Sequence, residues 1–309
     1  MRIVIAEFMD EAAVASLRPR FDVDYEPTLV DDRRSLLARL AGAQGLIVRN
    51  RTQVDADLLA RAPALRVVGR LGVGLDNIDM AACKARGITV FPATGANALA
   101  VAEYVVMTAM LLLRGILPAT AQVAGGQWPR AAFSNGRETA GKTLGLIGFG
   151  DIGRLTASLA TALGMDVVAT DPAVAADSPL WRERKVRALP LAELLAEADV
   201  VSLHVPLTAG TRGLLDGERL GLMKPGAVLI NSSRGGVVDE AALAQALRSG
   251  RLAGAALDVF AEEPLPVGSV LADVPNLILT PHVGGLTLES NQRVSSMVAE
   301  RVSRFLGVD

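Results

Sequence analysis

Short hydrophobic runs alternate with helix-like segments along the whole chain. Each run holds β-branched and aliphatic residues, and the intervening segments repeat apolar residues at helical spacing, which is the pattern of βαβ units with parallel strands. The runs form two series, a first at residues 2–6, 45–48, 65–68 and 88–91 and a second at residues 143–147, 166–169, 200–203, 227–230, 254–257 and 277–279. The sequence therefore predicts an α/β protein with two doubly wound parallel sheets.

Three segments outside these runs indicate how the two series are connected. A helical segment at about residues 97–117 and an irregular stretch at residues 125–141, which holds Gly-Gly and Asn-Gly breaker pairs, separate the two series. Residues 287–305 again show helical spacing of apolar residues. We expect this terminal helix to return to the first unit. The length of 309 residues is ample for two domains.

Composition and charge argue against several classes of function. Lys and Arg number 31 against 33 Asp and Glu, so the net charge is −2 and we expect no nucleic-acid partner. The most apolar stretch, residues 98–113, carries Glu103 and is shorter than the roughly 20 residues that span a bilayer, so we expect no membrane insertion. With Cys83 as the single cysteine and no Cys/His cluster, we expect no metal site. The N-terminus lacks the apolar region and cleavage site of a signal peptide, so we expect a cytoplasmic protein.

A glycine motif follows the first strand of the second series. Gly148, Gly150 and Gly153 lie between the strand at residues 143–147 and a helical run. In this context the first glycine permits a tight turn, the second lets the backbone approach a pyrophosphate, and the third lets the helix pack close to the strand. The start of the helix offers free N–H groups to the same anion. The sequence therefore predicts a dinucleotide-binding site.

Asp171 closes the next predicted strand, about 20 residues beyond the glycine motif. Its carboxylate would accept hydrogen bonds from the 2′-hydroxyl of an adenosine ribose and would repel a 2′-phosphate. The following Pro172 and Ala173 provide no arginine to neutralise that phosphate. These features favour NAD over NADP. The alternative is a solvated acid that ends a strand.

A second glycine loop, Gly69–Asn77, follows a strand of the first series. If the fingerprint begins at Gly72, Asn77 occupies the place of the third glycine, so close packing of helix on strand is lost and we expect no second nucleotide site. The backbone N–H groups of Val73 and Gly74 can form a nest for a small carboxylate. The alternative is a plain turn between strand and helix.

The chain has only two histidines, so a histidine-dependent mechanism has only two candidates. His282 follows the last predicted strand, at the carboxyl end where open α/β sheets bind ligands. His204 also ends a strand, but it is flanked by apolar residues and has no evident acidic partner. We expect His282 to be catalytic and His204 to line the cofactor site.

Arg234 and Glu263 follow two further strands of the second series. Reduction of a ketone needs a cation for the carboxylate and carbonyl, a proton donor, and a group that keeps the donor protonated. Arg234 suits the first role because its fork grips carboxylates, His282 suits the second because imidazole titrates near neutrality, and Glu263 suits the third. Each residue alone has a structural alternative, but the three together, at successive strand ends behind a dinucleotide loop, favour catalysis.

These motifs resemble those of the D-isomer-specific 2-hydroxyacid dehydrogenase family, which includes D-3-phosphoglycerate dehydrogenases and hydroxypyruvate or glyoxylate reductases. The resemblance runs through Val48-Arg49, Gly69–Asn77, Ala102-Glu103, Gly141–Gly145, the glycine motif, Leu203–Thr208, Asn231–Gly235, Asp258–Phe260 and Thr280–His282. It implies that Arg234, Glu263 and His282 are the catalytic residues. It also implies a set of NAD-binding residues and a set of substrate-binding residues. The NAD set is Gly148, Gly150, Asp151, Ile152, Gly153, Asp171, His204, Pro206, Ser232, Ser233 and Asp258, and the substrate set is Arg49, Asn50, Arg51, Val73, Gly74, Asn97 and Arg234.

The resemblance also implies how the chain is organised. The family fold is two doubly wound domains around a cleft, here a nucleotide domain at residues 97–284 and a catalytic domain at residues 1–96 and 285–309. Members are commonly dimers joined through their nucleotide domains, and the apolar helix at residues 98–113 suits such an interface, although it can also be plain core. The sequence ends at residue 309, so we expect no C-terminal regulatory domain. The related formate dehydrogenases lack the acid that this chain has at Glu263, so the resemblance argues against formate as a substrate.

The expected partner is a small anionic 2-oxo or 2-hydroxy acid, and its side chain stays open. Arg49 and Arg51 follow one strand of the first series and exceed the need of a single carboxylate. They favour a second anionic group, as in phosphohydroxypyruvate or sulfopyruvate, because Arg forks match tetrahedral oxyanions. If the arginines face solvent, hydroxypyruvate or glyoxylate becomes the expected substrate. An alternative of another class is an NAD-binding corepressor, a regulatory protein that the family also resembles.

Overall fold

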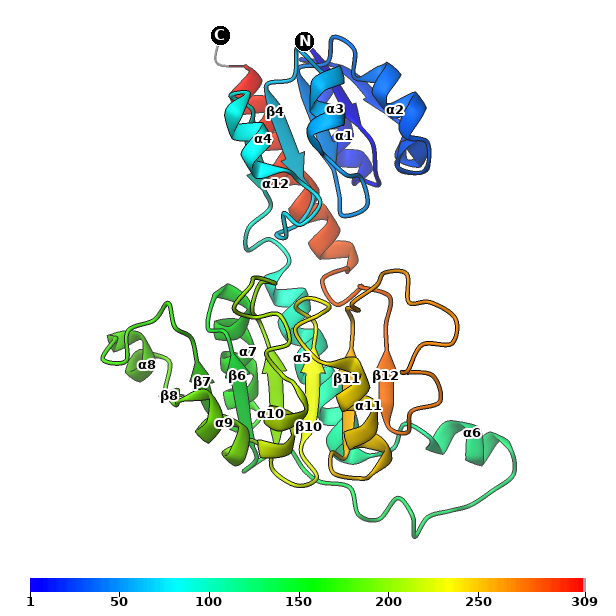
Figure 1. Ribbon diagram of the computed structural model, residues 1–309, viewed down its shortest axis with the longest axis vertical. Helices are drawn as coiled ribbons and strands as arrows, with labels where there is room; N and C mark the ends of the chain where they lie inside the picture. Colours follow the sequence, from blue (N-terminus) through cyan, green and yellow to red (C-terminus); the bar gives the residue numbers. More distant parts are fainter. Residues whose placement is uncertain (308–309) are drawn as a thin grey trace. The chain divides into compact units, whose positions relative to one another are not determined.

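The computed structural model describes residues 1–307, which form two compact units (Figure 1). Unit 1 comprises residues Met1–Asn97 and the segment that begins at Leu286, and unit 2 comprises residues Ala98–Gly285. Val308 and Asp309, which end the predicted catalytic-domain range, lie outside the described residues. Each unit contains one parallel sheet, so the prediction of two parallel-sheet α/β domains is confirmed.

The sheet of unit 1 has five parallel strands in the order β2-β1-β3-β4-β5. The strands are β1 (Arg2–Ile5), β2 (Asp22–Tyr25), β3 (Gly45–Val48), β4 (Val67–Arg70) and β5 (Thr89–Pro92). The helices are α1 (Glu11–Leu17), the 3₁₀ helix η1 (Pro27–Asp31), α2 (Arg33–Arg39), α3 (Ala56–Arg61), α4 (Met80–Ala85) and α12 (Leu288–Leu306). The winding direction changes between β1 and β3, and ligands of such sheets bind at this switch point.

Alternate strand residues of unit 1 face two separate cores. Ile3 and Ile5 of β1 pack with α1 and α12, whereas Val4 of the same strand packs with α2, α3 and α4. The predicted return of the terminal helix is therefore confirmed, and Figure 1 shows α12 beside β4. Gly69 of β4 permits this approach, because a Cβ atom there would lie 2.5 Å from Cγ1 of Val298.

The sheet of unit 2 has seven parallel strands in the order β12-β11-β10-β9-β6-β7-β8. The strands are β6 (Thr143–Ile147), β7 (Asp166–Thr170), β8 (Arg187–Ala188), β9 (Val200–Leu203), β10 (Val228–Asn231), β11 (Gly254–Leu257) and β12 (Leu277–Leu279). The helices are α5 (Ala98–Arg114), α6 (Ala119–Ala124), α7 (Asp151–Ala162), α8 (Pro179–Glu183), α9 (Leu191–Glu197), α10 (Gly217–Leu222) and α11 (Glu240–Arg248). The helices α5 and α7 cover one face, and α9, α10 and α11 cover the other.

Aspartate side chains start most of the helices that cover the sheets. The carboxylates of Asp10, Asp32, Asp55, Asp79, Asp216 and Asp239 accept backbone N–H groups of the first turns of α1, α2, α3, α4, α10 and α11, respectively. Helix α7 differs, because its N-cap residue is Gly150 and no side chain accepts its N–H groups. A twelve-residue helix therefore presents free donors and its positive dipole end at the glycine motif.

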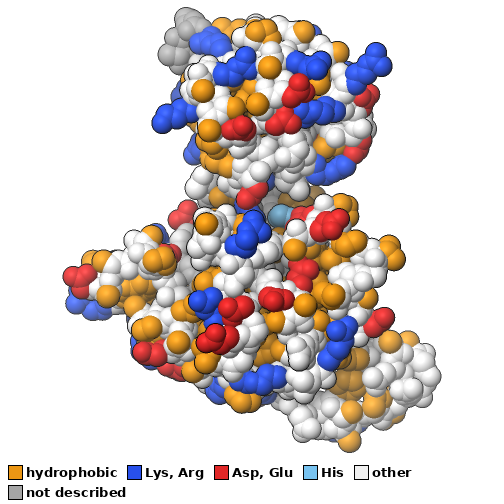
Figure 2. Space-filling model, viewed as in Figure 1, with side chains coloured by type: hydrophobic (Ala, Val, Ile, Leu, Met, Phe, Trp, Pro, Cys, Tyr) orange, Lys and Arg blue, Asp and Glu red, His pale blue; other side chains and the backbone are white. Residues whose placement is uncertain are grey.

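The surface has a mixed charge on the face that Figure 2 shows. Lys and Arg side chains are interspersed with Asp and Glu side chains over both units. Within residues 1–307, no helix is long and apolar enough to cross a membrane. The same residues hold no group of three or more His, Cys, Asp or Glu side chains arranged to bind a metal ion.

Candidate active site

Most of the predicted cofactor and catalytic residues follow strands of the unit 2 sheet. The glycine motif follows β6, Asp171 follows β7, His204 follows β9, Ser232 to Arg234 follow β10, Asp258 follows β11 and His282 follows β12. Because all seven strands are parallel, these residues lie at one edge of the sheet. The winding direction changes between β6 and β9, which places the glycine motif and His204 on either side of the switch point.

The glycine motif has the geometry of an anion cradle. Gly148 has φ +100°, and a Cβ atom there would lie 2.4 Å from the carbonyl oxygen of His204. A Cβ atom on Gly153 would lie 2.5 Å from the carbonyl oxygen of Gly148. By contrast, Gly150 faces open space, and it is followed by exposed Asp151 and half-buried Ile152 on the first turn of α7. The motif therefore combines close packing with an accessible row of backbone N–H groups.

The Asp171 carboxylate lies against the glycine motif. Its Oδ2 accepts the N–H of Phe149 at 2.7 Å and its Oδ1 accepts the N–H of Ala173 at 2.8 Å. Phe149 is fully buried and stacks on Trp181 with ring centroids 4.8 Å apart. Trp181 was not among the predicted site residues, because its role is to pack beneath the loop rather than to face a ligand.

The imidazole of His204 is held in its neutral form. Its Nε2 lies 3.1 Å from Oγ of Ser202, and its backbone N–H donates to Ile147 at 2.7 Å. Burial lowers the pKa of His204 to about 4. Pro206, two residues further, is exposed. A neutral ring at this position suits contact with a cofactor rather than proton transfer.

The turn after β10 is organised by Asn231. Its Oδ1 accepts the N–H of Ser233 at 3.1 Å and the hydroxyl of Ser233 at 2.8 Å, and its Nδ2 donates to the carbonyl oxygen of Arg234 at 3.0 Å. The buried hydroxyl of Ser232 has no hydrogen-bond partner in the described part of the chain. Nη1 of Arg234 donates to the carbonyl oxygen of Ser233 at 2.6 Å. Ser233 is thus a structural member of this turn, whereas Ser232 retains an unused hydroxyl.

Glu263 and His282 form a hydrogen-bonded pair. Nδ1 of His282 lies 2.8 Å from Oε2 of Glu263, and Oε1 of Glu263 accepts the N–H of Phe260 at 3.1 Å. Burial raises the pKa of Glu263, but hydrogen bonds from His282 and Phe260 and the positive charges of His282 and Arg234 lower it further, so the net shift is downward. The carboxylate is therefore ionised near neutrality. The pair leaves Nε2 of His282 for proton exchange with a ligand.

Asp258 holds the loop that carries His282. Its side chain is only 1% exposed, and its carboxylate accepts the N–H groups of Val283 and Gly284 at 2.8 and 2.7 Å and the hydroxyl of Thr280 at 2.6 Å. His282 has φ +57°, an uncommon backbone conformation outside glycine, and these bonds on both sides of it hold it there. The geometry thus gives Asp258 a role in positioning His282.

Tyr104 of α5 extends this network. Its hydroxyl lies 2.7 Å from Oγ1 of Thr280, which already donates its own proton to Asp258. Burial raises the pKa of Tyr104, so its hydroxyl is protonated and donates to Thr280. Tyr104 was not among the residues predicted from the sequence, because it lies in an apolar helix where an aromatic residue fits a core pattern.

The predicted substrate residues lie in unit 1, apart from Arg234. Arg49, Asn50 and Arg51 follow β3, and Val73 and Gly74 follow β4, so both groups lie at the carboxyl edge of this sheet. Asn97 ends the first segment of unit 1, and its buried Oδ1 has no partner among the described residues.

The two arginines of this set have different surroundings. Arg51 is exposed and forms an ion pair with Asp31. Arg49 is half-buried, donates to the carbonyl oxygen of Phe8 at 3.3 Å and to Oδ1 of Asn291 at 2.5 Å, and makes no ion pair with a carboxylate in residues 1–307. Its guanidinium also lies 5.6 Å from the ring centroid of Phe8. Arg49 is thus the arginine whose charge is available for an anionic ligand.

The residues of unit 2 fit a dinucleotide. An uncapped helix start and an open glycine can receive a pyrophosphate, and the Ser232 hydroxyl can pair with a polar group of the ligand. When bound, NAD supplies or accepts a hydride at this edge of the sheet.

Comparison with known proteins agrees with this geometry. The family model described as "D-isomer specific 2-hydroxyacid dehydrogenase, NAD binding domain" matches residues 106–284. The chain is 56% identical over 306 residues to (S)-sulfolactate dehydrogenase of Chromohalobacter salexigens, a match that covers 99% of this chain and 98% of that protein. It is 42% identical over 303 residues to D-3-phosphoglycerate dehydrogenase of Mycobacterium tuberculosis, covering 97% of this chain and 56% of that protein. The chain thus spans about half the length of that second relative.

Solved structures show the same fold. The TT0316 protein from Thermus thermophilus superimposes with a TM-score of 0.89 at 37% identity, covering 99% of this chain and 97% of that chain. D-lactate dehydrogenase from Aquifex aeolicus, solved with NAD and lactic acid, superimposes with a TM-score of 0.87 at 28% identity, covering 99% and 96%.

The lowered pKa of His204 predicts a pH effect on stability. The ordinary pKa of histidine is 6.5, and the pKa of His204 in the folded chain is about 4. As the pH falls from 6.5 to 4, the His204 imidazole is therefore protonated in the unfolded chain before it is protonated in the folded chain. The stabilising contribution is fully present above pH 6.5 and is lost across that window, at up to about 1.4 kcal/mol per pH unit. Urea unfolding at several pH values should show a shallower decline in the free energy of unfolding for His204→Gln than for the parent. Parallel declines would contradict this assignment.

Proposed function

Because the chain belongs to the D-isomer-specific 2-hydroxyacid dehydrogenase family, it is an NAD-dependent oxidoreductase that acts on a CH–OH group, and we propose that its substrate is a small 2-hydroxy acid with a second anionic group. The observation that carries the proposed chemistry is the Glu263–His282 hydrogen bond of 2.8 Å in the unit that also holds the NAD-binding motif. Unit 2 is accordingly the nucleotide domain of the proposal, and unit 1 is the substrate domain.

Each member of the catalytic trio has one proposed role. In the direction of ketone reduction, His282 donates the proton from Nε2 to the developing alkoxide, because its Nδ1 is held by Glu263. Glu263 stabilises the imidazolium and fixes the orientation of the ring. Arg234 binds the substrate carboxylate and polarises the carbonyl group. In the direction of oxidation, His282 accepts the hydroxyl proton at the same atom.

Most of the proposed cofactor residues contact NAD directly, and one of them acts by positioning a neighbouring loop. We propose that the pyrophosphate binds Gly150, Asp151 and Ile152 at the start of α7, and that Asp171 accepts a ribose hydroxyl with the lone pairs that Phe149 and Ala173 leave free. In this proposal the rest of the NAD site is lined by His204, Pro206, Ser232 and Ser233. Asp258 affects the NAD site indirectly, through the His282 loop that its carboxylate holds.

The substrate proposal rests on Arg49 and on the relatives. A half-buried guanidinium with no carboxylate partner among the described residues is ready to pair with a sulfonate or phosphate group. (S)-Sulfolactate dehydrogenase and D-3-phosphoglycerate dehydrogenase, two relatives of this chain, are both named for substrates with such a group. We propose that Arg49 binds the second anionic group of the substrate, and that the backbone of Val73 and Gly74 helps to bind its carboxylate. We also propose that the protein is cytoplasmic.

A second candidate function is hydroxypyruvate or glyoxylate reductase. One observation favours it: Arg51 forms an ion pair with Asp31. Of the two arginines expected to bind a second anionic group of the substrate, Arg51 is therefore already paired. A single arginine in unit 1 is then enough for a substrate with one carboxylate.

The two candidates differ in substrate preference. With the second anion bound by Arg49, kcat/KM for sulfopyruvate or phosphohydroxypyruvate should exceed that for hydroxypyruvate by at least about tenfold, since a charge-assisted hydrogen bond contributes roughly 1.5–3 kcal/mol. Arg49→Ala should remove this preference, whereas Arg51→Ala and the exposed control Arg34→Ala should largely keep it. The assay follows NADH absorbance. Equal efficiency with all three acids in the parent would favour the reductase.

The pH profile tests the Glu263–His282 pair. The pKa of Glu263 lies below its ordinary value, so the carboxylate persists through the neutral range and is lost only as the pH falls through that lowered pKa. In Glu263→Gln the imidazolium of His282 loses its charged partner, so the alkaline limb of kcat/KM for reduction should move to lower pH. The neighbouring exposed control, Glu262→Gln, should leave the profile in place. An unmoved limb in Glu263→Gln would rule out the pairing.

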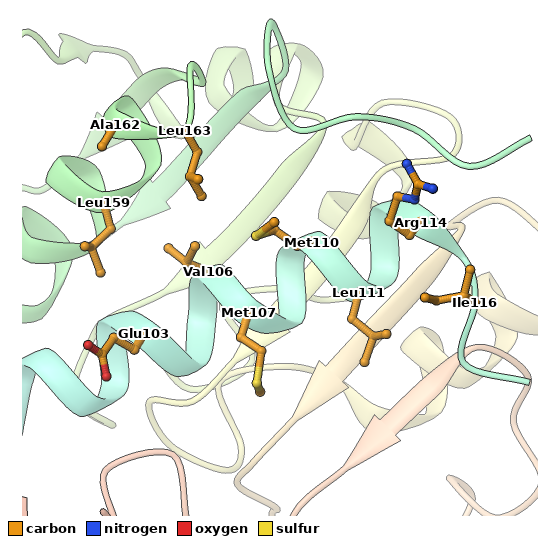
Figure 3. Close-up of a pocket in the computed structure, with 10 residues that line it drawn as sticks. All are labelled: Glu103, Val106, Met107, Met110, Leu111, Arg114, Ile116, Leu159, Ala162 and Leu163. Atoms are coloured by element: carbon orange, nitrogen blue, oxygen red, sulfur yellow. The ribbon is translucent and has the colours of Figure 1, made fainter. Parts of the chain in front are cut away.

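We also propose that the protein is a homodimer joined through α5. An apolar groove of about 630 Å³ runs along the exposed face of α5 and is flanked by α7. Figure 3 shows Met107, Met110 and Leu111 projecting from α5, with Leu159 of α7 and Leu163, the residue after α7, nearby. Glu103 and Arg114 lie toward the two ends of the helix. In a two-fold symmetric dimer the same face of both subunits meets, and we propose this face of α5 for that contact.

The register of this face favours an antiparallel pair of α5 helices. A two-fold axis midway between residues 108 and 109 would place Glu103 opposite Arg114 of the partner subunit and Met107 opposite Met110 of the partner subunit. Helix α6 has no buried residue and Trp128 beyond it is 80% exposed, and Figure 1 shows α6 projecting away from the rest of unit 2. We propose that this arm and the groove together form the dimer contact.

A charge reversal tests this register. Glu103→Arg and Arg114→Glu should each weaken the dimer, because like charges then face each other, and the double variant should restore it. Met110→Glu should give monomers, whereas Val267→Glu, at a fully exposed site, should not. Sedimentation equilibrium measures the dissociation constant. A monomeric parent, or a dimer that Met110→Glu leaves intact, would contradict the proposed interface.

A further inference from the structure

A buried carboxylate lies beneath the loop that follows β3. Glu7 comes shortly after β1 and is 4% exposed. Its Oε1 accepts the N–H groups of Arg49 at 2.8 Å and Thr52 at 3.0 Å, and its Oε2 accepts the N–H of Arg51 at 3.3 Å. Three backbone donors of one short loop therefore converge on a single side chain.

Asn77 holds the acceptors of the same loop. It is 6% exposed, and its Nδ2 donates to the carbonyl oxygen of Arg49 at 3.2 Å and to that of Thr52 at 2.7 Å. Its own backbone carbonyl accepts the N–H of Val54 at 2.8 Å, so Asn77 also holds the exit of the loop. Glu7 and Asn77 together pair five backbone groups of the Arg49–Thr52 loop.

Formation of the parallel sheet does not itself require Glu7 and Asn77 to hold the loop in this way. Burial of a carboxylate is costly, and hydrogen bonds to N–H groups offset that cost only when the groups stay in place. Glu7 and Arg49 follow β1 and β3, the two strands that flank the switch point of the unit 1 sheet, where ligands of such sheets bind. The buried Glu7 carboxylate and its backbone donors thus lie at the edge of the sheet where a ligand would bind.

The held loop also fixes the start of the Arg49 side chain. Its guanidinium is then oriented by the carbonyl oxygen and ring of Phe8 and by Asn291. Burial lowers the pKa of Arg49, and the negative charge of Glu7 opposes that shift. Glu7 therefore acts on Arg49 both through the backbone and through its charge.

We propose that Glu7 and Asn77 are positioning residues that hold the Arg49–Thr52 loop in the conformation that binds the anionic substrate. This inference rests on the proposed function, in which Arg49 contacts that substrate. Holding the loop before binding removes the entropy cost of ordering it with each substrate molecule. Loss of either residue should thus weaken substrate binding with little effect on the proton transfer at His282.

The test uses Glu7→Gln, which keeps size but puts an NH₂ group where one oxygen accepted a hydrogen bond. The matched control is Glu26→Gln, in which the altered carboxylate accepts only solvent-exposed hydrogen bonds, from Thr28. The substrate is whichever of sulfopyruvate, phosphohydroxypyruvate and hydroxypyruvate the parent reduces most efficiently. KM for this acid should rise about tenfold in Glu7→Gln, as expected for one lost hydrogen bond to a charged group. The kcat and the KM for NADH should stay within about twofold of the parent.

A double-mutant cycle separates positioning from general damage to the fold. If Glu7 acts through Arg49, then Glu7→Gln should raise KM much less in an Arg49→Ala background than in the parent. A fall in melting temperature with KM unchanged would show a structural role only and overturn the inference. Equal effects of Glu7→Gln in both backgrounds would overturn it as well.

The outcomes also separate this inference from the function on which it rests. If Arg49→Ala raises KM and Glu7→Gln does not, the inference fails and the substrate role of Arg49 stands. If Arg49→Ala leaves KM unchanged, both fail. Should Glu7→Gln not yield folded protein, Asn77→Ala removes the other half of the interaction, and the same rise in KM and the same cycle with Arg49→Ala apply to it.

Discussion

A carboxylate buried in a protein must have its hydrogen bonds satisfied, and this constraint shapes both sheet edges of the molecule. In unit 2, Asp258 accepts two backbone N–H groups and one hydroxyl from the segment around His282. In unit 1, Glu7 accepts three N–H groups from the loop that begins with Arg49. In each case hydrogen bonds from backbone N–H groups replace hydrogen bonds from water to the carboxylate. The loop that supplies these N–H groups is therefore held in one conformation.

The parallel topology decides where such loops occur. Strands that run in one direction deliver their carboxyl ends to one edge, so loops far apart in sequence meet there. The 2.8 Å bond between Glu263 and His282 joins the segments after β11 and β12 in this way. The helices contribute differently, because aspartate side chains cap half of the described α-helices, whereas no side chain caps the start of α7 at the glycine motif. The same elements that form the core therefore also leave one helix start free for an anion.

The sequence was sufficient to predict most of the strands, their parallel arrangement and the glycine motif, because these depend on local patterns. It placed the strand after α3 at residues 65–68, whereas β4 spans Val67–Arg70, since Gly69 and Arg70 lack the apolar character of a strand. It also missed β2 and the two-residue β8, whose exposed or half-buried residues show no apolar run. The helix predicted to reach residue 117 ends at Arg114.

The sequence could select the polar strand-end residues of the candidate site but not the residues that support them. Arg234, Glu263 and His282 follow strands and carry recognisable chemistry, so their positions and residue types together selected them. Tyr104 and Glu7 bond to residues 176 and 42 to 45 positions away in the chain, and no local pattern encodes such pairs. Tyr104 instead fits the pattern of a core aromatic, and Glu7 that of a solvated acid.

In the proposed mechanism His282 transfers the proton, and unit 2 binds NAD without help from His282. Rapid mixing of the enzyme–NADH complex with a 2-oxo acid measures the single-turnover rate of NADH oxidation, and fluorescence titration measures NADH affinity in the same preparation. His282→Gln should keep the affinity for NADH and reduce the single-turnover rate by roughly 10²- to 10⁴-fold, the usual contribution of a positioned acid. A near-normal single-turnover rate in His282→Gln would contradict the account.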